Sequence, residues 1–457
     1  MSDIPSSLPA SLWNALAGDP AALTVLRFTG DGSLPSAFAV TDLAAAAIAA
    51  AALAVAELVH TRGHARPLVQ IDRRLASFWF ASSLRPIGWK VPGAWDSIAG
   101  DYRTSDGWIR LHTNAPHHRA AVERVLGPHA GREAVAHAVA TRSKADLEHA
   151  IVDSGGCAAQ MFSIDEWRAH PQGRAVASEP LIHTVTTERA TARDWPIQIA
   201  RPLAGIRVLD LTRVLAGPVA SRFLAGYGAD VLRVDPPSWS EPGVVPETTL
   251  GKRCARLDLT NKDDRIVFEL LLSEADVLLH GYRADALDRL GYDAAARARL
   301  RPGLIDVSLN AYGWSGALRN RRGFDSLLQM STGIADAGMR WKNADRPVPL
   351  PVQALDHATG YLMAGTVVRG ITRRFIAAHG TRAKLSLART AQLLIDQNAA
   401  AAAPMFAAES AVDVATAIER TAWGDARRLI VPVTIDCAPM RWDTPATELG
   451  SAEPRWL

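Results

Sequence analysis

The sequence predicts an α/β fold, with a Rossmann-like parallel sheet, flanking helices and a smaller α+β domain. Residues 203–235 read as a strand, a short helix that ends near Gly226, and a second strand that ends at Asp235. This is the pattern of one βαβ unit in a parallel sheet. Further apolar segments alternate with helical segments as far as residue 307. Such alternation favours a doubly wound sheet with ligands at the carboxyl ends of its strands.

The first part of the chain predicts helices and one short strand. Residues 1–34 are a lead-in with a short helix around Trp13. Residues 35–80 contain a loop, an Ala-rich helix that begins near Asp42, a strand over 68–71 and a helix from Asp72. The run over 43–56 is mostly alanine and short for a membrane span, so we expect a tightly packed helix inside a soluble protein.

Residues 106–171 predict the small α+β domain. The segment DGWIRLHTN (106–114) has the pattern of a strand, and 117–150 predicts two amphipathic helical segments, the second capped at Ser143. A short helix capped by Ser163 follows. We expect a charged connector over 186–202 and therefore two regions, residues 1–200 and residues 201–457.

The second region predicts the parallel sheet. Strands are expected at 231–234, 254–257, 277–279 and 304–307, and helices at 261–274 and 284–300. No GxGxxG motif follows the first strand, so the glycine fingerprint of a dinucleotide site is absent.

Composition excludes several classes of function. The formal charge of +3 over 457 residues gives no basic face for nucleic acid. Three distant cysteines, with neither metal-ligand spacing nor a disulfide framework, predict a reducing cytoplasm. The three histidines near residue 115 lack carboxylate or cysteine partners at ligand spacing, so we expect no metal. No signal peptide is expected at the N-terminus.

Two segments of the chain echo each other. Residues 35–80 and 349–395 each contain apolar residues, an aspartate, a helix of small residues, a basic loop, a short strand and a helix. Asp42 and Asp356 are the matching positions. We interpret the pair as a degenerate internal repeat. Two aspartates that cap Ala-rich helices by chance remain the alternative.

Five segments, in order, carry a resemblance to a known family. They are LTRVLAGP (211–218), GKRCARLDL (251–259), EADVLLHGYRADALDRLGYD (274–293), the stretch 302–334, and PVQALDHATGYLMAG (351–365). Together they resemble the class III CoA-transferases (CaiB/BaiF type), which include formyl-CoA transferases, carnitine CoA-transferases and α-methylacyl-CoA racemases.

The resemblance implies the family's fold and an enzyme that moves coenzyme A from an acyl-CoA thioester to a carboxylic acid. It assigns Asp356 as the nucleophile, which passes through an aspartyl anhydride and an aspartyl-CoA thioester. A helix begins near Asp356, so we expect its dipole to favour the carboxylate. Coenzyme A is then substrate and product, and an interlocked homodimer is implied.

The resemblance also assigns the residues that bind coenzyme A. They are Val214, Leu215, Ala216, Gly217 and Pro218 in the turn beneath the pantetheine, and Lys252, Arg253, Arg283, Arg289 and Arg322 near the phosphates. Formyl-CoA transferases have Gln where this chain has Leu215, which argues against formyl or oxalate specificity.

Two alternatives remain from the sequence. An α-methylacyl-CoA racemase would pair the aspartate with a histidine at position 324, where this chain has Phe324. A CoA-binding pseudoenzyme or partner subunit is the other alternative. It is suggested by the family's small domain, which is reduced after residue 396 while its counterpart at 106–171 precedes the sheet. Asp42, which lacks the CoA-binding segments in its own half, is expected to be structural.

Overall fold

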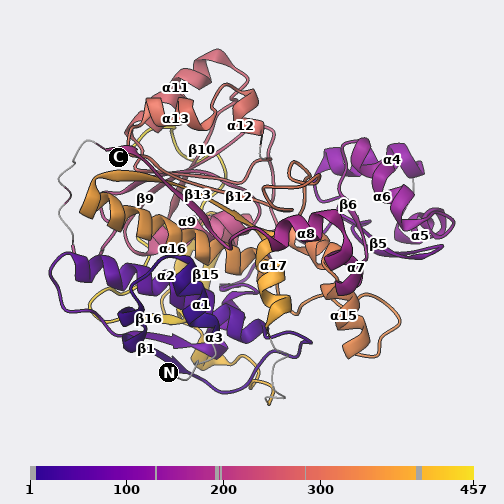
Figure 1. Cartoon of the computed structure of the whole chain (residues 1–457), viewed down its shortest axis with the longest axis horizontal. Coiled ribbons are helices and arrows are strands. Elements are labelled where there is room, and N and C mark those ends of the chain that lie inside the picture. Colours follow the sequence, from indigo (N-terminus) through magenta and orange to yellow (C-terminus); the bar gives the residue numbers. More distant parts are fainter. Residues whose placement is uncertain (1–6, 129–130, 191–194, 196–197, 284, 398–403) are drawn as a thin grey trace.

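The structure is a computed structural model of the whole chain, and it describes residues 7–128, 131–190, 195, 198–283, 285–397 and 404–457 (Figure 1). Its largest element is a seven-stranded sheet in the order β10-β9-β8-β11-β12-β13-β7. Six strands run parallel, and β7 joins β13 antiparallel at one edge. The strands are β7 (His183–Arg189), β8 (Arg207–Leu211), β9 (Asp230–Asp235), β10 (Lys252–Arg256), β11 (Val277–His280), β12 (Ile305–Asn310) and β13 (His379–Ser386). The predicted α/β fold is confirmed.

Helices cover both faces of this sheet. On one face, α9 (Ala216–Gly226), α16 (Ala354–Ala377) and α2 (Val40–Thr61) share one apolar core with alternate strand residues such as Val208 and Val307. On the other face, α11 (Lys262–Glu274) and α12 (Ala286–Arg289) pack on the intervening residues, Leu209 and Leu278 among them. The sheet is therefore buried on both sides, as parallel sheets require.

The strand order places a crevice at the middle of the sheet. From β8 the chain moves outward through β9 and β10, then returns to β11 on the other side of β8 and continues through β12 and β13. β8 and β11 are thus neighbours whose following loops leave in opposite directions. In such sheets the ligand binds beyond the carboxyl ends of these two strands.

The small α+β domain lies beside the sheet (Figure 1). It has an antiparallel sheet of β4 (Gly100–Thr104), β5 (Gly107–Leu111) and β6 (Ala158–Gln160). Its helices are α4 (Pro116–Leu126), α5 (Arg132–Ala140) and α6 (Lys144–Asp153), and α7 (Ile164–Ala169) and α8 (Pro171–Ala177) follow. The predicted caps at Ser143 and Ser163 are confirmed, since each side chain accepts a backbone N–H. Three helices occupy 116–153 where we predicted two.

Two three-stranded sheets connect the chain's two ends. One sheet has the order β1-β2-β16, with β1 (Leu26–Thr29), β2 (Val69–Asp72) and β16 (Val433–Ile435). The other sheet has the order β14-β15-β3, with β14 (Glu419–Thr421), β15 (Gly424–Arg428) and β3 (Leu84–Pro86). The remaining helices are α1 (Leu8–Ala15), η1 (Pro20–Val25), α3 (Arg73–Trp79), α10 (Val245–Thr248), α13 (Ala294–Leu300), α14 (Asp325–Ser331), α15 (Ile334–Trp341), α17 (Leu387–Asp396) and η2 (Ala411–Asp413). Both small sheets, and β7 in the large sheet, cross the boundary that we predicted near residue 200.

The helix predicted over 284–300 is interrupted. α12 ends at Arg289, Gly291 adopts a left-handed conformation with φ of +87°, and α13 begins after Asp293, whose side chain accepts the Ala296 N–H. A residue with φ in this range cannot continue a right-handed helix. The apolar periodicity continues through this turn, so it could not reveal the break.

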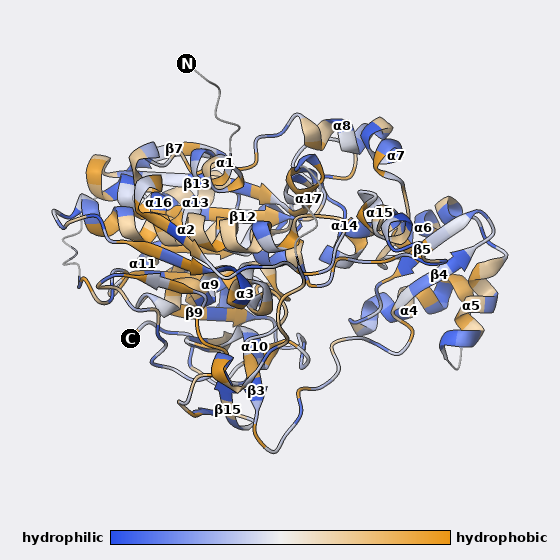
Figure 2. Cartoon of the chain, turned by 90° about the horizontal axis from the view of Figure 1, so that it is seen from below, coloured by the Kyte–Doolittle hydropathy of each residue, from blue (hydrophilic) through white to orange (hydrophobic). Residues whose placement is uncertain are grey.

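The Ala-rich segment forms α2, which is long and apolar enough to cross a membrane by length and composition but is almost wholly buried inside the protein. Figure 2 shows it in the interior of the chain beside α16. Its alanine side chains, from Ala44 to Ala56, are buried in the core. Small side chains let the two helices approach closely, as the sequence predicts.

Candidate active site

The loop between β8 and α9 has a strained backbone. Val214 has φ of +65°, a conformation that a β-branched residue rarely adopts. Its N–H donates to Glu241 Oε2 at 2.9 Å, which holds the turn in place. Gly217 lies so close to Thr212 that an added Cβ would come within 2.2 Å of that side chain. Strain maintained by surrounding contacts is a common property of ligand-binding loops.

Asp356 is the third residue of α16, one turn inside the helix start at Gln353, so it is not the N-cap that we considered. Its backbone N–H donates to Asp325 Oδ2 at 2.9 Å, while Gln329 Nε2 donates to Asp325 Oδ1 at 2.5 Å. Asp325 therefore satisfies a free N–H at the start of α16 and fixes the position of Asp356.

The electrostatics of Asp356 differ from our expectation. Burial, followed by the neighbouring charge of Asp325, raises the pKa of Asp356 well above its ordinary 3.8. Burial likewise raises the pKa of Asp325 to about 6. The helix dipole was expected to favour the charged carboxylate, yet the pKa of Asp356 is raised. The reason is that a helix dipole stabilises a buried charge by less than the loss of water destabilises it.

Asp356 lines a cavity of about 500 Å³ at the crevice beyond β8 and β11. Among the described residues that line it, Asp356 is the one carboxylate, and it is 8% exposed. Four arginines line the same cavity: Arg213, Arg283, Arg321 and Arg322. A single shielded carboxylate thus shares the cavity with several cationic side chains, which favour anionic ligands.

Arg213 lies between two aromatic rings of the cavity wall. Its guanidinium carbon is 4.7 Å from the Trp239 ring centroid and 4.9 Å from that of Tyr282. Its Nη2 also donates to the Tyr282 hydroxyl at 3.1 Å. Its nearest carboxylate is the buried Asp235, 3.7 Å away. The stacked rings hold the cation in a fixed orientation while leaving most of its donors available.

The structure brings some of the predicted CoA-binding residues together. Val214, Leu215, Ala216, Gly217, Arg283 and Arg322 line the cavity with Asp356. Pro218 is buried one residue deeper in α9. Arg289 lies on α12, where it pairs with Asp285 at 2.5 Å and does not line the cavity.

Lys252 and Arg253 do not line this cavity either. Lys252 is fully buried, and its Nζ donates to the Pro218 carbonyl at 2.9 Å and faces Asp210 Oδ2 at 3.4 Å. Arg253 pairs with Asp230 at 2.9 Å. Lys252 therefore supports the first turn of α9 from below, and the predicted phosphate contacts of both residues find no support in their positions.

Several residues that line the cavity, and Asp325 beside Asp356, were missed by the sequence analysis. Arg213 lies inside the LTRVLAGP segment and could have been found there, whereas Asp325 adjoins the Phe324 that we weighed only as a racemase position. His117 and His118 come from α4 of the small domain and carried no usable signal. Phe324 also lines the cavity, and the His112 ring stacks on it at 3.7 Å between centroids.

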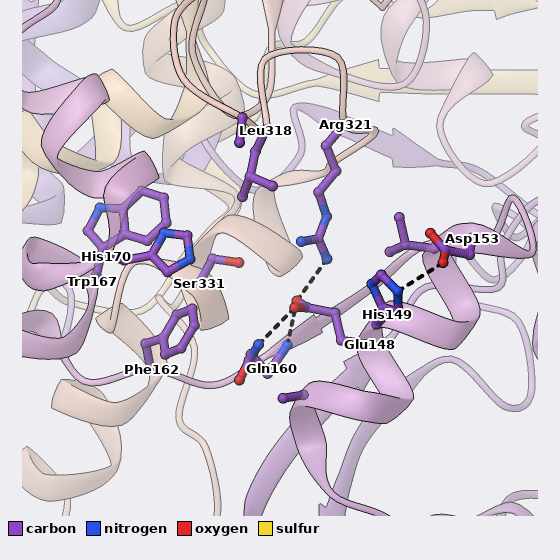
Figure 3. A pocket seen from close by; sticks show the side chains of 13 residues that line it. Glu148, His149, Asp153, Gln160, Phe162, Trp167, His170, Leu318, Arg321 and Ser331 are labelled. Atoms are coloured by element: carbon purple, nitrogen blue, oxygen red, sulfur yellow. Dashed lines mark hydrogen bonds and ion pairs between the residues drawn. The ribbon is translucent and has the colours of Figure 1, made fainter.

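A second cavity of about 480 Å³ lies between α6, α7 and the loop that contains Arg321 (Figure 3). Asp356 does not line it. Figure 3 shows Arg321 and Gln160 converging on Glu148, whose Oε1 accepts from Arg321 Nη2 at 2.7 Å and from the Gln160 N–H at 3.0 Å. The arginine that separates the two cavities is thus already neutralised. Among the residues that the structure describes, no group of three potential ligands could hold a metal ion.

Comparison with known proteins finds similarity to one family of enzymes. Residues 203–422 match CoA-transferase family III. The chain is 29% identical over 301 residues to an acyl-CoA transferase of Gibberella moniliformis, a match that covers 60% of this chain and 52% of that protein. Over 194 residues it is 31% identical to the mouse succinyl-CoA:glutarate CoA-transferase, covering 39% and 44% respectively. Through residues 203–422, the chain is similar to CoA-transferase family III.

Other relatives extend the same comparison. The chain is 31% identical over 189 residues to the probable fatty acyl-CoA transferase Rv3272 of Mycobacterium tuberculosis, covering 38% and 48% of the two chains. A crystal structure of Rv3272 superposes with a TM-score of 0.40 at 26% identity, covering 43% of this chain and 59% of that one. The chain spans about half the length of the first curated relatives it matches.

Proposed function

We propose that this protein is a CoA-transferase that moves coenzyme A from an acyl-CoA thioester to a carboxylic acid. The observation that carries the proposal is the position of Asp356, a single shielded carboxylate in a cavity that four arginines also line. The carboxylate supplies a nucleophile that can form an anhydride. The arginines suit the phosphates of coenzyme A.

The reaction proceeds through Asp356 in four transfers. The carboxylate attacks the thioester carbonyl, forms a mixed anhydride and releases the CoA thiolate. The thiolate then attacks the aspartyl carbonyl, which releases the donor acid and leaves an aspartyl-CoA thioester. The acceptor carboxylate displaces the thiolate to form a second anhydride, and the returning thiolate takes the acceptor acyl group and frees Asp356. Exclusion of water matters, because either anhydride would otherwise hydrolyse.

Other features of the cavity fit this chemistry. The first turn of α9 and the strained loop at Val214 form the wall closest to β8, where the pantetheine is expected. Neither Arg283 nor Arg322 pairs with a carboxylate among the residues that the structure describes. Arg322 Nη1 donates to the Gly155 carbonyl at 2.9 Å, and its remaining donors, like those of Arg283, can meet phosphate. The open cavity around Asp356 counts against a pseudoenzyme.

The experiment is intact-mass spectrometry after incubation with a panel of acyl-CoA thioesters, followed by trapping with hydroxylamine. We expect a covalent adduct that maps to the Asp356 peptide and is absent in Asp356→Asn. An adduct elsewhere, or transfer that persists in this variant, contradicts the proposal. A racemase would instead exchange the α-proton of a 2-methylacyl-CoA with deuterium from solvent and form no adduct.

A further inference from the structure

The chain contains two halves with the same sequence of elements at their centres. We call residues 26–189 the first half and residues 207–435 the second half. In the first, β1 and β2 run parallel, α2 connects them and α3 follows β2. In the second, β12 and β13 run parallel, α16 precedes β13 and α17 follows it. The repeat expected from the sequence therefore extends one strand further toward the N-terminus.

The two central helices begin in the same way. The residues before them, Ala39 and Gln353, have φ, ψ of −74°, 57° and −75°, 63°. In each case the first helical N–H donates to a carbonyl two residues back, at 2.8 Å: Val40 to Phe38, and Ala354 to Val352. Asp42 and Asp356 are then the third residues of α2 and α16. A shared unusual turn at matching positions supports a common origin.

The last strand of each half joins the sheet of the other half. β7 ends the first half but pairs antiparallel with β13, with His183 opposite Lys384. β16 ends the second half but pairs antiparallel with β2, with Gln70 opposite Thr434. The strand orders β12-β13-β7 and β1-β2-β16 are therefore equivalent, and the exchange is reciprocal. Two halves related in this way are interlocked.

The halves are unequal at the site. Among the residues that the structure describes, the sheet of the first half has three strands and no counterparts of β8 to β11, whose loops form the cavity wall of the second half. Asp42 instead pairs with Arg73 at 2.6 Å, and its side chain is 42% exposed. Only the second half combines the aspartate with the loops of a complete sheet.

The first half nevertheless contributes to the cavity of Asp356. Residues 115–118, at the start of α4, line it. His117 lies close enough to Arg213 and Arg322 that their charges, after burial, lower its pKa. The cavity is therefore bounded by the sheet loops of one half and the small domain of the other.

We propose that the chain is an interlocked pair folded within one polypeptide, in which the first half takes the place of a partner subunit and closes the cavity of Asp356. The unit is a monomer with one nucleophile, and it replaces the homodimer that the resemblance implies. The statement about the nucleophile rests on the proposed function, whereas the interlocking within one chain does not.

The topology is tested with disulfides across each strand exchange. His183→Cys/Lys384→Cys links β7 to β13, and Gln70→Cys/Thr434→Cys links β2 to β16; all four residues lie at least partly exposed. Directly opposite strand residues are close enough for such a bond. The exposed Cys437 is first replaced by Ser to prevent other cross-links.

After oxidation, each pair is expected to leave a single-chain band on a non-reducing gel and to block alkylation of both cysteines. Sedimentation of the parent chain is expected to give the mass of one chain, 49.0 kDa. A two-chain disulfide in either variant means that the halves of two molecules are exchanged and overturns the proposal. Failure to oxidise in both variants, or a stable dimer of the parent chain, overturns it as well. None of these readouts needs turnover.

The closure of the cavity is tested by His117→Glu, which places a carboxylate beside Arg213 and Arg322 where an anion should bind. We expect KM for the acyl-CoA to rise at least about tenfold, the size of one lost charged contact, with a smaller change in kcat. His137→Glu, an exposed histidine on α5 of the same small domain, is the matched control. An unchanged KM would show that the first half does not contribute to the acyl-CoA site.

Co-production of the His117→Glu and Asp356→Asn chains decides whether His117 and Asp356 of the same molecule line one cavity. If two chains shared their halves, a mixed pair would combine an intact His117 with an intact Asp356 and recover activity. We expect no recovery above the sum of the two variants made separately. Recovery overturns the proposal. If the wild-type chain transfers no CoA at all, the proposed function fails while the disulfide and sedimentation results still decide the topology.

Discussion

Replacing Asp325 with asparagine is expected to make Asp356 a stronger acid while keeping it in place. The asparagine side chain retains an amide oxygen that can accept the Asp356 N–H, which Asp325 accepts at 2.9 Å. The substitution removes the second cause of the raised pKa of Asp356, the neighbouring charge, and leaves the first, burial. Because transfer needs the carboxylate form, activity at low pH should increase.

The size of the effect follows from the ionisation of Asp325 itself. Neighbouring carboxylates shift each other's pKa by about one to three units. Since burial remains, and since Asp325 ionises only near its own pKa of about 6, we expect the lower end of that range. The acid limb of kcat/KM should move down by about one pH unit, or ~1.4 kcal/mol of differential stabilisation.

The assay is kcat/KM for the acyl-CoA donor between about pH 5 and pH 9, where the acid limb reports the free enzyme's essential base. Asp42→Asn, at the equivalent position of α2, is the control and should leave the profile unchanged. An acid limb that stays in place or moves up in Asp325→Asn refutes the reasoning, provided that the variant keeps its wild-type circular dichroism.

The remaining predictions concern the same region. Asp356→Asn should abolish transfer. It should also raise the Tm measured by calorimetry relative to wild type at pH 8 but not at pH 4, because a carboxyl with a raised folded pKa destabilises the native state only above its unfolded pKa of about 4. An equal Tm difference at both pH values contradicts this. Arg283→Ala and Arg322→Ala should each weaken CoA binding about tenfold by isothermal titration, and more so at low salt. Lys252→Ala should instead lower the Tm, because it removes the donor to the Pro218 carbonyl and the cation beside the buried Asp210. CoA affinity should change less than in the arginine variants. Gly217→Ala should cost about 1–3 kcal/mol of stability in urea titration, because its Cβ would overlap Thr212; an unchanged midpoint would show that the loop relaxes freely.

The parts of the fold that rest on local pattern could be predicted. The βαβ unit around α9, the strands that follow it and the helix caps at Ser143 and Ser163 are each specified within a few neighbouring residues. The repeat was visible because Asp42 and Asp356 begin helices of the same kind. The break at Gly291 could not be predicted with equal certainty, because an isolated glycine in an apolar pattern is compatible with a helix or a turn.

The parts of the site that depend on which way a side chain faces could not be predicted. A lysine at the start of a strand is usually solvated, yet Lys252 points inward because the Pro218 carbonyl of α9 and Asp210 of β8 lie next to it. Likewise His117 reaches the cavity only because the small domain of one half packs over the sheet of the other. Such contacts join segments that lie at least 34 residues apart in the sequence, and no periodicity records them.

Asp42 and Asp356 show that the helix alone does not make a nucleophile. Both are third residues of a helix that starts with the same backbone turn, and both helices pack in the same core. Asp356 meets the loops of a complete parallel sheet, is shielded from water and lies next to Asp325, so its pKa is raised. Asp42 meets Arg73 and solvent. The difference lies in the strands that only the second half possesses. Among the described residues, the first half has no counterparts of those strands, so a shared helix start is not enough to place Asp42 in a cavity like that of Asp356.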